Sequence, residues 1–477
     1  MGRRATLLQI AWDAVRARSD GPEAIAARRD ARLAGMLAHA RRNPFYRRHW
    51  SGLGGNARLA DLPPVTKAEW VEGFDESVAD PAITREAVWE YMQDRARVGH
   101  PWLGRYSVCR SSGIAGKKAL FVTDQHAMDV YWALWLTRGW MSWLGARGAA
   151  RLARRGGRVA SVIATNAHFA SAAMVRRPSP MGDLANVRST TLSIQKPVSR
   201  IVRALNYWQP AALVGYPTAL DCLAVEQLRG RLSLDIVLAV SVSEWVEPAA
   251  RERIEEAFGC PLRDSYAASE FLALGFECPE GWLHVNADWV VLEPVDEALR
   301  PVPPGETSHT ALVTNLVNRT QPVIRHDLGD RVTVRPEPCP CGSPLPAMHV
   351  EGRQHDTLFF RDGDREVALL PMALIIGLLG SIPGIGPGTQ MVQTAEDVLS
   401  FRVQFSEGAD IDAAWREMAA RVRSYLRARG LAHVSVELSP IPPGRDPRTG
   451  KLRRTWSEVP VSAVHSTRSG ARNMASD

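Results

Sequence analysis

The stretch ALFVTDQHAMDVYWALWLTRGW (119–140) decides the fold, because it passes from a strand pattern directly into a helical one. Its first five residues have the character of a buried strand, and the residues from Asp124 onward have the length and apolar content of a helix. The same alternation runs from about residue 104 to residue 330. Further strand-like runs are YSVCR (106–110), RVASVIAT (158–165), AALVGY (211–216), DIVLAVS (235–241) and HTALVTNL (309–316), and a second clear helix is EPAARERIEEAFG (247–259). The pattern predicts an α/β architecture with largely buried sheets.

The two ends of the chain have different patterns. Residues 1–100 are predicted to be mostly helical, with Thr66 capping a helix that starts at Lys67. After Gly352, a strand (398–405), a helix (410–430) and another strand (433–439) predict a small α+β domain. The helix places one apolar stripe on Ile411, Trp415, Met418, Val422 and Leu426, and Gly430 ends it. We expect an N-terminal domain over 1–352, a C-terminal domain over 353–460 and a disordered tail over 461–477.

Composition limits the classes of function. The 477 residues are too many for one compact core, and a net charge of +7 suits an anionic small molecule as well as it suits a nucleic acid. Six unevenly spaced cysteines make no disulfide framework. The N-terminus has the pattern of an amphipathic helix rather than a signal peptide, and prolines interrupt the uncharged stretch 367–388, which we expect to be a buried helix and a loop. These features predict a soluble cytoplasmic protein with neither a membrane nor a nucleic acid as partner.

The loop SSGIAGKK (111–118) lies between two strand-like runs and offers groups that bind anionic oxygens. Gly113 and Gly116 allow backbone N–H groups to point into one concavity, Ser111 and Ser112 add hydroxyls, and Lys117 adds charge. The strand on either side excludes the Walker arrangement, in which a helix follows the loop. Taken alone, the stretch fits a β-hairpin turn with solvated lysines better than a phosphate-binding loop.

Four further motifs follow in order: DSYAASE (264–270), IRHDLGD (324–330), EGRQHD (351–356) and RTGKLRR (448–454). With the Ser/Gly loop in front, the series resembles the adenylate-forming superfamily, most closely its phenylacetate–CoA ligase-like branch. The resemblance runs from about residue 45 to residue 455, and TNLVNRTQPVIRHDLGD (314–330) is especially similar to that branch. Each motif alone is weak, but five in the expected order form a specific pattern.

The resemblance implies a large ATP- and acid-binding domain of layered sheets and helices, followed by a small mobile lid domain. It also implies ATP-dependent activation of a carboxylic acid, and electrostatic catalysis along the triphosphate. In that scheme the loop from Ser111 to Lys117 holds the pyrophosphate end, Glu270 coordinates Mg²⁺ and Lys451 neutralises the α-phosphate. Each carboxylate and lysine, considered alone, fits an ordinary solvated side chain equally well.

The remaining nucleotide contacts are also carried over by resemblance. Tyr266 stacks on adenine, and Ser269 lies beside it in the same motif. Asp330 accepts hydrogen bonds from the ribose hydroxyls, and Arg353 contacts the ribose or a phosphate. Glu244, in SVSEWV (241–246), matches the glutamate of the family's Gly-Gly-Glu segment beside adenine, but neither glycine is present here.

Two residues are predicted to face the acid. His168, in ATNAHFA (164–170), lines the acyl pocket or orients the carboxylate in the reading by resemblance, and a satisfied core histidine is the alternative. Tyr216 ends a strand, and α/β proteins gather ligand contacts at such sheet edges. An aromatic or medium-length acid fits the resemblance.

A metal cluster is the next candidate site. ECPEGWLH (277–284) contains Cys278 and His284, and CPCG (339–342) contains Cys339 and Cys341. Three thiolates and an imidazole suit tetrahedral Zn²⁺, and four protein ligands make a closed structural site. The cluster also resembles one found in some phenylacetate–CoA ligase-like proteins. Buried reduced cysteines beside a surface histidine are the alternative.

Two departures from the family pattern leave the function open. Ile114 and Ala115 replace two threonines of the phosphate loop, which removes two hydroxyl donors at a cost of about 1–3 kcal/mol each if the groups left behind are buried. The hinge position is His355, where the family usually has Asp or Lys. We expect transfer of the acyl group to coenzyme A, with two alternatives: transfer to an amine or a carrier protein, and a nucleotide-binding module that has lost catalysis. A homodimer is expected by family analogy alone.

Overall fold

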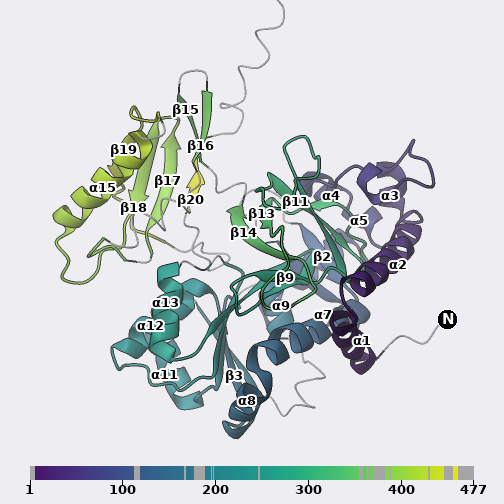
Figure 1. The fold of residues 1–477 in the computed structure, drawn as a ribbon, viewed down its shortest axis with the longest axis horizontal. Coiled ribbons are helices and arrows are strands. Elements are labelled where there is room, and N and C mark those ends of the chain that lie inside the picture. The colour runs from purple at the N-terminus through teal and green to yellow at the C-terminus, as the bar shows by residue number, and fades with distance from the viewer. Residues whose placement is uncertain are drawn as a thin grey trace, which may run out of the picture. The chain divides into compact units, whose positions relative to one another are not determined.

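The structure, a computed structural model, describes residues 6–111, 119–165, 168–176, 188–194, 196, 198–244, 246, 248–353, 358–362, 365–369, 382–386, 388–427, 430–444 and 455–459. These residues divide into two compact units, and almost all of those up to Glu351 belong to the first (Figure 1). The second unit begins at Gly352. Each unit is described by itself.

A nine-stranded sheet is the frame of the first unit, as far as the described residues show. Its strand order is β13-β14-β9-β8-β7-β6-β5-β3-β4. The strands are β3 (Arg158–Ile163), β4 (Arg188–Ser193), β5 (Ala212–Gly215), β6 (Leu238–Val242), β7 (Leu262–Ala268), β8 (Phe271–Glu277), β9 (Leu283–Val285), β13 (Asp330–Val334) and β14 (Ala347–Arg353). The block from β4 to β7 is parallel, whereas β8, β9 and β14 are joined to it by antiparallel pairings.

Helices connect the parallel strands, as a parallel sheet requires. The connecting helices are α9 (Ala170–Arg176), α11 (Val198–Trp208), α12 (Pro217–Leu228) and α13 (Pro248–Phe258). The strands are almost continuously buried because helices cover the sheet, and residues from β3, β5, β6, α11 and α12 form one apolar core. The α/β architecture predicted from the alternating pattern is therefore confirmed.

Two smaller sheets belong to the same unit. The strands β1 (Ser107–Arg110) and β2 (Leu120–Thr123) form an antiparallel pair. The strands β10 (Val290–Val295), β11 (Thr310–Asn315) and β12 (His326–Asp327) form a three-stranded antiparallel sheet. Both sheets pack with N-terminal helices in a second large apolar core.

The N-terminal region is helical, as its sequence predicts. Its elements are α1 (Leu7–Asp20), α2 (Pro22–Ala40), α3 (Pro44–His49), η1 (Leu59–Asp61), α4 (Lys67–Glu72), α5 (Phe74–Ser77), α6 (Arg85–Gln93) and η2 (Arg95–Arg97). Helix α4 starts at Lys67 with Thr66 as its N-cap, and Thr66 and Glu69 form a capping box. This reciprocal pair satisfies two backbone N–H groups that the first turn leaves without partners.

The helix predicted over 124–140 is interrupted. Asp124 caps α7 (Gln125–Leu134) by accepting a hydrogen bond from the backbone of Ala127. A π-helical segment over Trp135–Trp140 follows, and α8 (Met141–Arg154) continues from it with a kink at Gly145, whose φ is 56°. A π-segment adds a residue to the turn, so it changes which side chains face inward. One consequence is that Arg138 is only 6% exposed.

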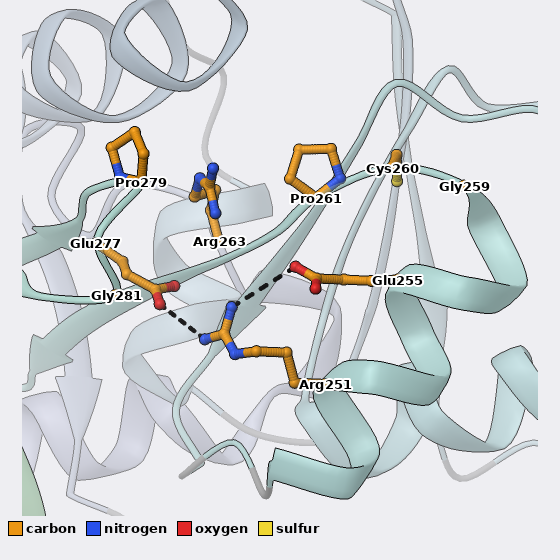
Figure 2. Close-up of a pocket in the computed structure, with 9 residues that line it drawn as sticks. All are labelled: Arg251, Glu255, Gly259, Cys260, Pro261, Arg263, Glu277, Pro279 and Gly281. Carbon is orange, nitrogen blue, oxygen red and sulfur yellow. Dashed lines mark hydrogen bonds and ion pairs between the residues drawn. The ribbon is translucent and has the colours of Figure 1, made fainter.

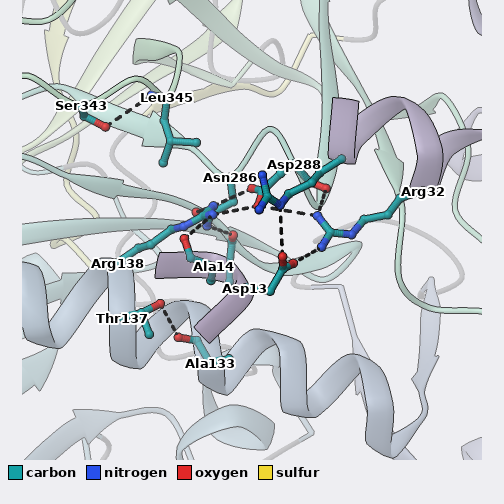
Figure 3. A network of polar contacts seen from close by, with 12 residues as sticks. Asp13, Ala14, Arg32, Ala133, Thr137, Arg138, Asn286, Asp288, Ser343 and Leu345 are labelled. Atoms are coloured by element: carbon teal, nitrogen blue, oxygen red, sulfur yellow. Dashed lines mark hydrogen bonds and ion pairs between the residues drawn. The ribbon is translucent and has the colours of Figure 1, made fainter. Parts of the chain in front are cut away.

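Arg138 lies at the centre of a polar network inside the first unit (Figure 3). Its guanidinium binds both carboxylate oxygens of Asp288, at 2.6 and 2.8 Å, and also the side-chain oxygen of Asn286 and the carbonyl of Ala14. Arg32 of α2 donates to the carbonyl oxygen of Asp288 at 2.7 Å. The network therefore ties the first two helices to the segment that follows β9.

The second unit is a small α+β domain. Its four-stranded sheet has the order β19-β18-β17-β20, and β15 (Leu358–Asp362) and β16 (Arg365–Leu369) form a separate hairpin. The sheet strands are β17 (Gln390–Ala395), β18 (Val398–Arg402), β19 (Ser435–Leu438) and β20 (Thr455–Ser457). Helix α15 (Ile411–Arg427) connects β18 to the parallel strand β19. The predicted strands and helix are thus present.

Two details of the second unit differ from the sequence-based expectations. Met418, Val422 and Leu426 of α15 are buried as predicted, but Ile411 in its first turn is 51% exposed. The apolar stripe therefore begins one turn later. Residues 367–369 belong to strand β16 rather than to a helix, and most of the rest of the uncharged stretch lies outside the described residues. Within the described parts of the chain, no helix combines the length and apolar character needed to cross a membrane.

Candidate functional site

The carboxyl ends of the parallel strands bring five of the predicted site residues to one edge of the large sheet. Strands β3, β5, β6 and β7 are parallel neighbours, so the segments that follow them emerge at the same edge. His168 comes after β3, Tyr216 after β5, Glu244 after β6, and Ser269 with Glu270 after β7. Ligands of open α/β sheets bind at such an edge.

The Ser/Gly loop starts from this edge as well. Arg110, the last residue of β1, donates its backbone N–H to the carbonyl of His168 at 2.9 Å. Ser111 donates to the carbonyl of Ala119 at 2.9 Å, which closes the base of the loop. The strands on the two sides of the loop, β1 and β2, are paired antiparallel. Four predicted ligands, Ser112, Gly113, Gly116 and Lys117, lie outside the described residues.

Tyr266 and Asp330 meet although 64 residues separate them in the sequence. The phenol of Tyr266, on β7, donates to a carboxylate oxygen of Asp330 at 2.7 Å. Asp330 is the first residue of β13 and is only 4% exposed. The two residues that the resemblance assigns to adenine and ribose are therefore adjacent.

Glu270 is held on both its backbone and its side chain. It lies in the two-residue turn between β7 and β8, where its carbonyl accepts a hydrogen bond from the Asn315 side chain at 2.9 Å. Its carboxylate contacts the Nε2 atom of His326 at 3.3 Å. Burial, reinforced by the negative charge of Glu270, raises the pKa of the nearby Cys109 thiol to about 12. Cys109 is therefore an uncharged neighbour of this carboxylate.

His326, Asn315 and Cys109 were missed as site residues from sequence. All three lie in or next to quoted stretches: Cys109 precedes the Ser/Gly loop, and the other two belong to the segment 314–330. The sequence offered one indication of their role, which is their position in or next to these motifs. Only their proximity to Glu270 in the structure distinguishes them from ordinary core residues.

His168 and Tyr216 are buried in the structure. His168 is 1% exposed, its Nε2 atom lies 3.3 Å from the carbonyl of Asp94, and burial lowers its pKa. Tyr216 is fully buried, and its hydroxyl contacts Ser171 at 3.3 Å. Both side chains are buried against other protein groups, and direct contact with an acid stays a prediction.

Glu244 follows a strained residue. Ser243 has a φ of 69°, in the left-handed region that glycine adopts most readily. The family that this chain resembles has two glycines in this segment, and glycine adopts a positive φ readily. Glu244 itself is partly buried.

The other predicted residues are placed only in part. Arg353 is the last residue of β14, and its side chain is not described. His355 and Lys451 lie outside the described residues.

The four predicted zinc ligands converge. The ligand atoms of Cys278, His284, Cys339 and Cys341 all lie within 4.8 Å of one another. The sulfurs of Cys278 and Cys339 are 3.8 Å apart, which is about the edge of a tetrahedron with Zn–S bonds of about 2.3 Å. The Nδ1 atom of His284 lies 2.8 Å from the carbonyl of Leu345, so Nε2 is directed at the cluster. The donor set and its geometry fit a structural zinc ion.

Zinc content gives a direct test of this cluster. The purified protein is expected to contain about one zinc per chain, and Cys339→Ser to lose it. Because bound metal stabilises the folded state, we expect the variant to lose about 4 kcal/mol or more of stability at a zinc concentration about 1,000-fold above Kd. Elemental analysis and denaturant unfolding measure both effects. Cys222→Ser, outside the cluster, is the matched control, and equal zinc content in both variants would contradict the assignment.

A pocket of about 550 Å³ lies at the other end of β7, beside the start of that strand (Figure 2). Arg251 crosses it and binds Glu277 at 2.8 Å and the carbonyl of Leu262 at 2.8 Å. Next to this pair, burial and the charge of Glu277 raise the pKa of the Asp264 carboxyl to about 7. The pocket is remote along β7 from Glu270, and it is not part of the candidate site.

Asp264 is expected to make stability depend on pH. Its folded-state pKa lies above the unfolded value, so its contribution is complete below about pH 4 and is lost as the pH rises through about 7. Asp264→Asn is expected to flatten the fall in unfolding free energy between pH 5 and pH 8, by up to about 3 kcal/mol. Urea unfolding at both pH values measures it. Parallel curves for the variant and the wild type would contradict this assignment.

Comparison with known proteins places these features in a known fold. No family model matches the chain. The Staphylococcus aureus protein CapK is 29% identical over 138 residues, a match that covers 28% of this chain and only 29% of CapK. A structure of 2-hydroxyisobutyryl-CoA ligase in the postadenylation state, in complex with R3-HIB-AMP, is 21% identical. It covers 93% of this chain and 90% of the ligase, with a TM-score of 0.66.

A more distant structure points the same way. The anthranilate CoA ligase AuaEII in complex with anthranoyl-AMP is 16% identical and covers 72% of this chain and 64% of its own, with a TM-score of 0.53. Both solved proteins are CoA ligases with an acyl-AMP bound. The chain therefore has the fold of the adenylate-forming CoA ligases.

Proposed function

We propose that this protein activates a carboxylic acid with ATP and transfers the acyl group to coenzyme A. The observation that carries the proposal is the sheet edge at which Glu270, the Tyr266–Asp330 pair and the base of the Ser/Gly loop meet. A nucleoside triphosphate needs a carboxylate for its metal ion, an aromatic ring to stack on the base and an acceptor for the ribose hydroxyls. It also needs a loop that binds its phosphates. The shared fold with acyl-AMP-bound ligases supports the same conclusion.

In the first proposed half-reaction, a carboxylate oxygen of the acid attacks the α-phosphorus of ATP and pyrophosphate leaves. Tyr266 stacks on adenine, and Asp330 accepts hydrogen bonds from the ribose hydroxyls. Glu244 and Arg353 complete the contacts with the nucleotide. Glu270 fits a magnesium ligand because a carboxylate is the hard donor that Mg²⁺ prefers, and its side chain remains 12% exposed. Bound Mg²⁺ neutralises charge on the phosphate oxygens. Lys451 and the Ser/Gly loop stabilise the charge that develops on the phosphates.

In the second proposed half-reaction, the thiolate of coenzyme A attacks the carbonyl carbon of the acyl adenylate and AMP leaves. The small domain, beginning near Gly352, is proposed to rotate about His355 between the two steps, as lid domains do. His168 and Tyr216, which are buried, are proposed to hold in place the segments that follow β3 and β5, where the acid would bind.

The finer assignments are part of the same proposal. We infer the phenylacetate–CoA ligase-like branch from the motif series, an aromatic acid as substrate, a structural Zn²⁺ in the cysteine cluster and a homodimer by analogy. We also propose a cytoplasmic location, because the six cysteines form no disulfide, and metal-binding cysteines are typical of a reducing compartment.

Pyrophosphate release tests the proposed function. It is measured with ATP and Mg²⁺ across aryl, arylacetic, hydroxy and aliphatic acids, with and without coenzyme A, for the wild type and Lys451→Ala. Acid-dependent release that collapses in the variant, with thioester formed when coenzyme A is added, is the expected result. Release without any response to coenzyme A would indicate another acceptor, such as an amine or a carrier protein. Bound ATP without release for any acid would indicate a module that has lost catalysis.

A further inference from the structure

His326 is fixed in place by its backbone and by its surroundings. It belongs to β12, where it pairs with Val313 of β11, and it also forms a bridge with Val65 on its other side. Its side chain is 2% exposed. A residue held between two neighbouring backbone segments has little freedom to move, so the direction of its side chain is defined by the sheet.

Two aromatic rings set the orientation of the imidazole. The ring of Trp70 lies 5.3 Å from it and the ring of Phe121 lies 6.0 Å from it, both nearly perpendicular to its plane. These two rings stack on each other at 5.6 Å, and the Trp70 indole donates to the carbonyl of Leu120. Leu120 and Phe121 belong to β2, the strand that follows the Ser/Gly loop. The imidazole is therefore enclosed by Trp70 of α4 and by Phe121 of β2, next to the base of the loop.

The cage leaves one nitrogen of His326 directed at Glu270. Its Nε2 atom lies 3.3 Å from a carboxylate oxygen of Glu270. Within the described part of the chain, its buried Nδ1 atom has no hydrogen-bond partner. A buried N–H without a partner costs more than a buried lone pair of the same nitrogen, because a hydrogen-bond donor is then left unsatisfied. The hydrogen is therefore assigned to Nε2, which faces a carboxylate oxygen of Glu270 at 3.3 Å.

We propose that His326 is the positioning residue of Glu270: it restricts the orientation of the carboxylate that would coordinate the metal of a metal–ATP complex. The inference rests on the proposed function, in which Glu270 is a magnesium ligand. Asn315 fixes the backbone of Glu270 from β11, and His326 fixes its side chain from β12. Groups that orient a metal ligand in this way typically change metal affinity about 10–100-fold.

Two substitutions separate the polar contact between His326 and Glu270 from the packing. His326→Phe keeps a ring inside the aromatic cage but removes the donor. His326→Gln keeps an N–H donor on a side chain of similar reach. Trp70→Phe, the matched control, alters the cage but keeps the donor. Thermal melting shows that each variant is folded.

The readout is binding of Mn²⁺ to the protein–ATP complex, followed by the electron paramagnetic resonance signal of free Mn²⁺, which does not require turnover. His326→Phe is expected to weaken Mn²⁺ binding about 10–100-fold, and His326→Gln and Trp70→Phe to stay within a few-fold of the wild type. The half-saturating Mg²⁺ concentration for pyrophosphate release is expected to rise by the same factor, while the rate at saturating Mg²⁺ changes less.

The outcomes distinguish this inference from the function on which it rests. If folded His326→Phe binds Mn²⁺ as tightly as the wild type does, His326 is a core residue and the inference is wrong, while the proposed function stands. If Trp70→Phe weakens binding as strongly as His326→Phe does, packing rather than the polar contact is responsible, and the inference is again overturned. A wild type that binds no Mn²⁺ with ATP would overturn the proposed function together with this inference.

Discussion

Replacing Arg138 with methionine is expected to lower the unfolding free energy of the first unit by about 3–5 kcal/mol. The guanidinium and the carboxylate of Asp288 are 4% and 0% exposed, and their bidentate contact is taken almost completely out of water. Without Arg138, the nearest cation described for Asp288 is Arg32, at 3.6 Å and in poorer geometry. Asp288 would thus keep a buried charge that is only partly compensated, and that penalty is larger than the net stabilisation of the intact pair.

A second substitution tests this physical reason. Arg138→Met combined with Asp288→Leu removes both charges and is expected to recover much of the lost stability, because an apolar pair of similar volume has no charge to desolvate. Arg29→Ala, which removes an exposed contact with Asp30, is the control and is expected to cost no more than about 1 kcal/mol. Urea unfolding of the first unit measures the unfolding free energy of the single variant, the double variant and the control. A loss below about 1 kcal/mol for Arg138→Met alone would contradict the account.

The sequence could not predict this network, and the reason is distance along the chain. Arg138 and Asp288 are 150 residues apart, and neither belongs to a motif. The inward direction of Arg138 also depends on the π-helical segment, which the apolar pattern of residues 124–140 does not reveal. Local signals did predict local structure: Thr66 caps α4, and the strand-like runs became strands of the large sheet and of the two smaller sheets.

The candidate site shows the same division. Motif order and resemblance singled out Tyr266, Glu270 and Asp330, because each belongs to a short stretch with a chemical reason for its residue types. The contacts that fix these residues were not predictable from the stretches alone. The pairing of His326 with Glu270 depends on β12 lying beside the β7–β8 turn, and the sealed position of His168 depends on Asp94 and Tyr91, far earlier in the chain. Sequence patterns identify the chemistry of a residue, whereas tertiary packing decides whether it is accessible.

Glu270→Gln is expected to lower kcat/KM for acid-dependent pyrophosphate release by about 10²–10³-fold, the usual scale for losing one electrostatic contact of a charged transition state. The amide has nearly the shape of the carboxylate, and its oxygen can still lie against Nε2 of His326. The change therefore removes the negative charge while the contacts of the β7–β8 turn remain. Glu256→Gln, an exposed glutamate of α13, removes the same charge elsewhere and is expected to leave the rate unchanged.

The dependence on Mg²⁺ identifies the cause of the loss. If Glu270 binds the metal, Glu270→Gln raises the half-saturating Mg²⁺ concentration, and part of the rate returns at high Mg²⁺. Lys451→Ala is expected to lower the maximal rate at an unchanged half-saturating concentration, because this lysine is proposed to act on the α-phosphate directly. If Glu270→Gln instead lost rate with no change in the Mg²⁺ requirement, its carboxylate would contact the substrate rather than the metal, and the magnesium assignment would have to move to another oxygen ligand at this edge of the sheet.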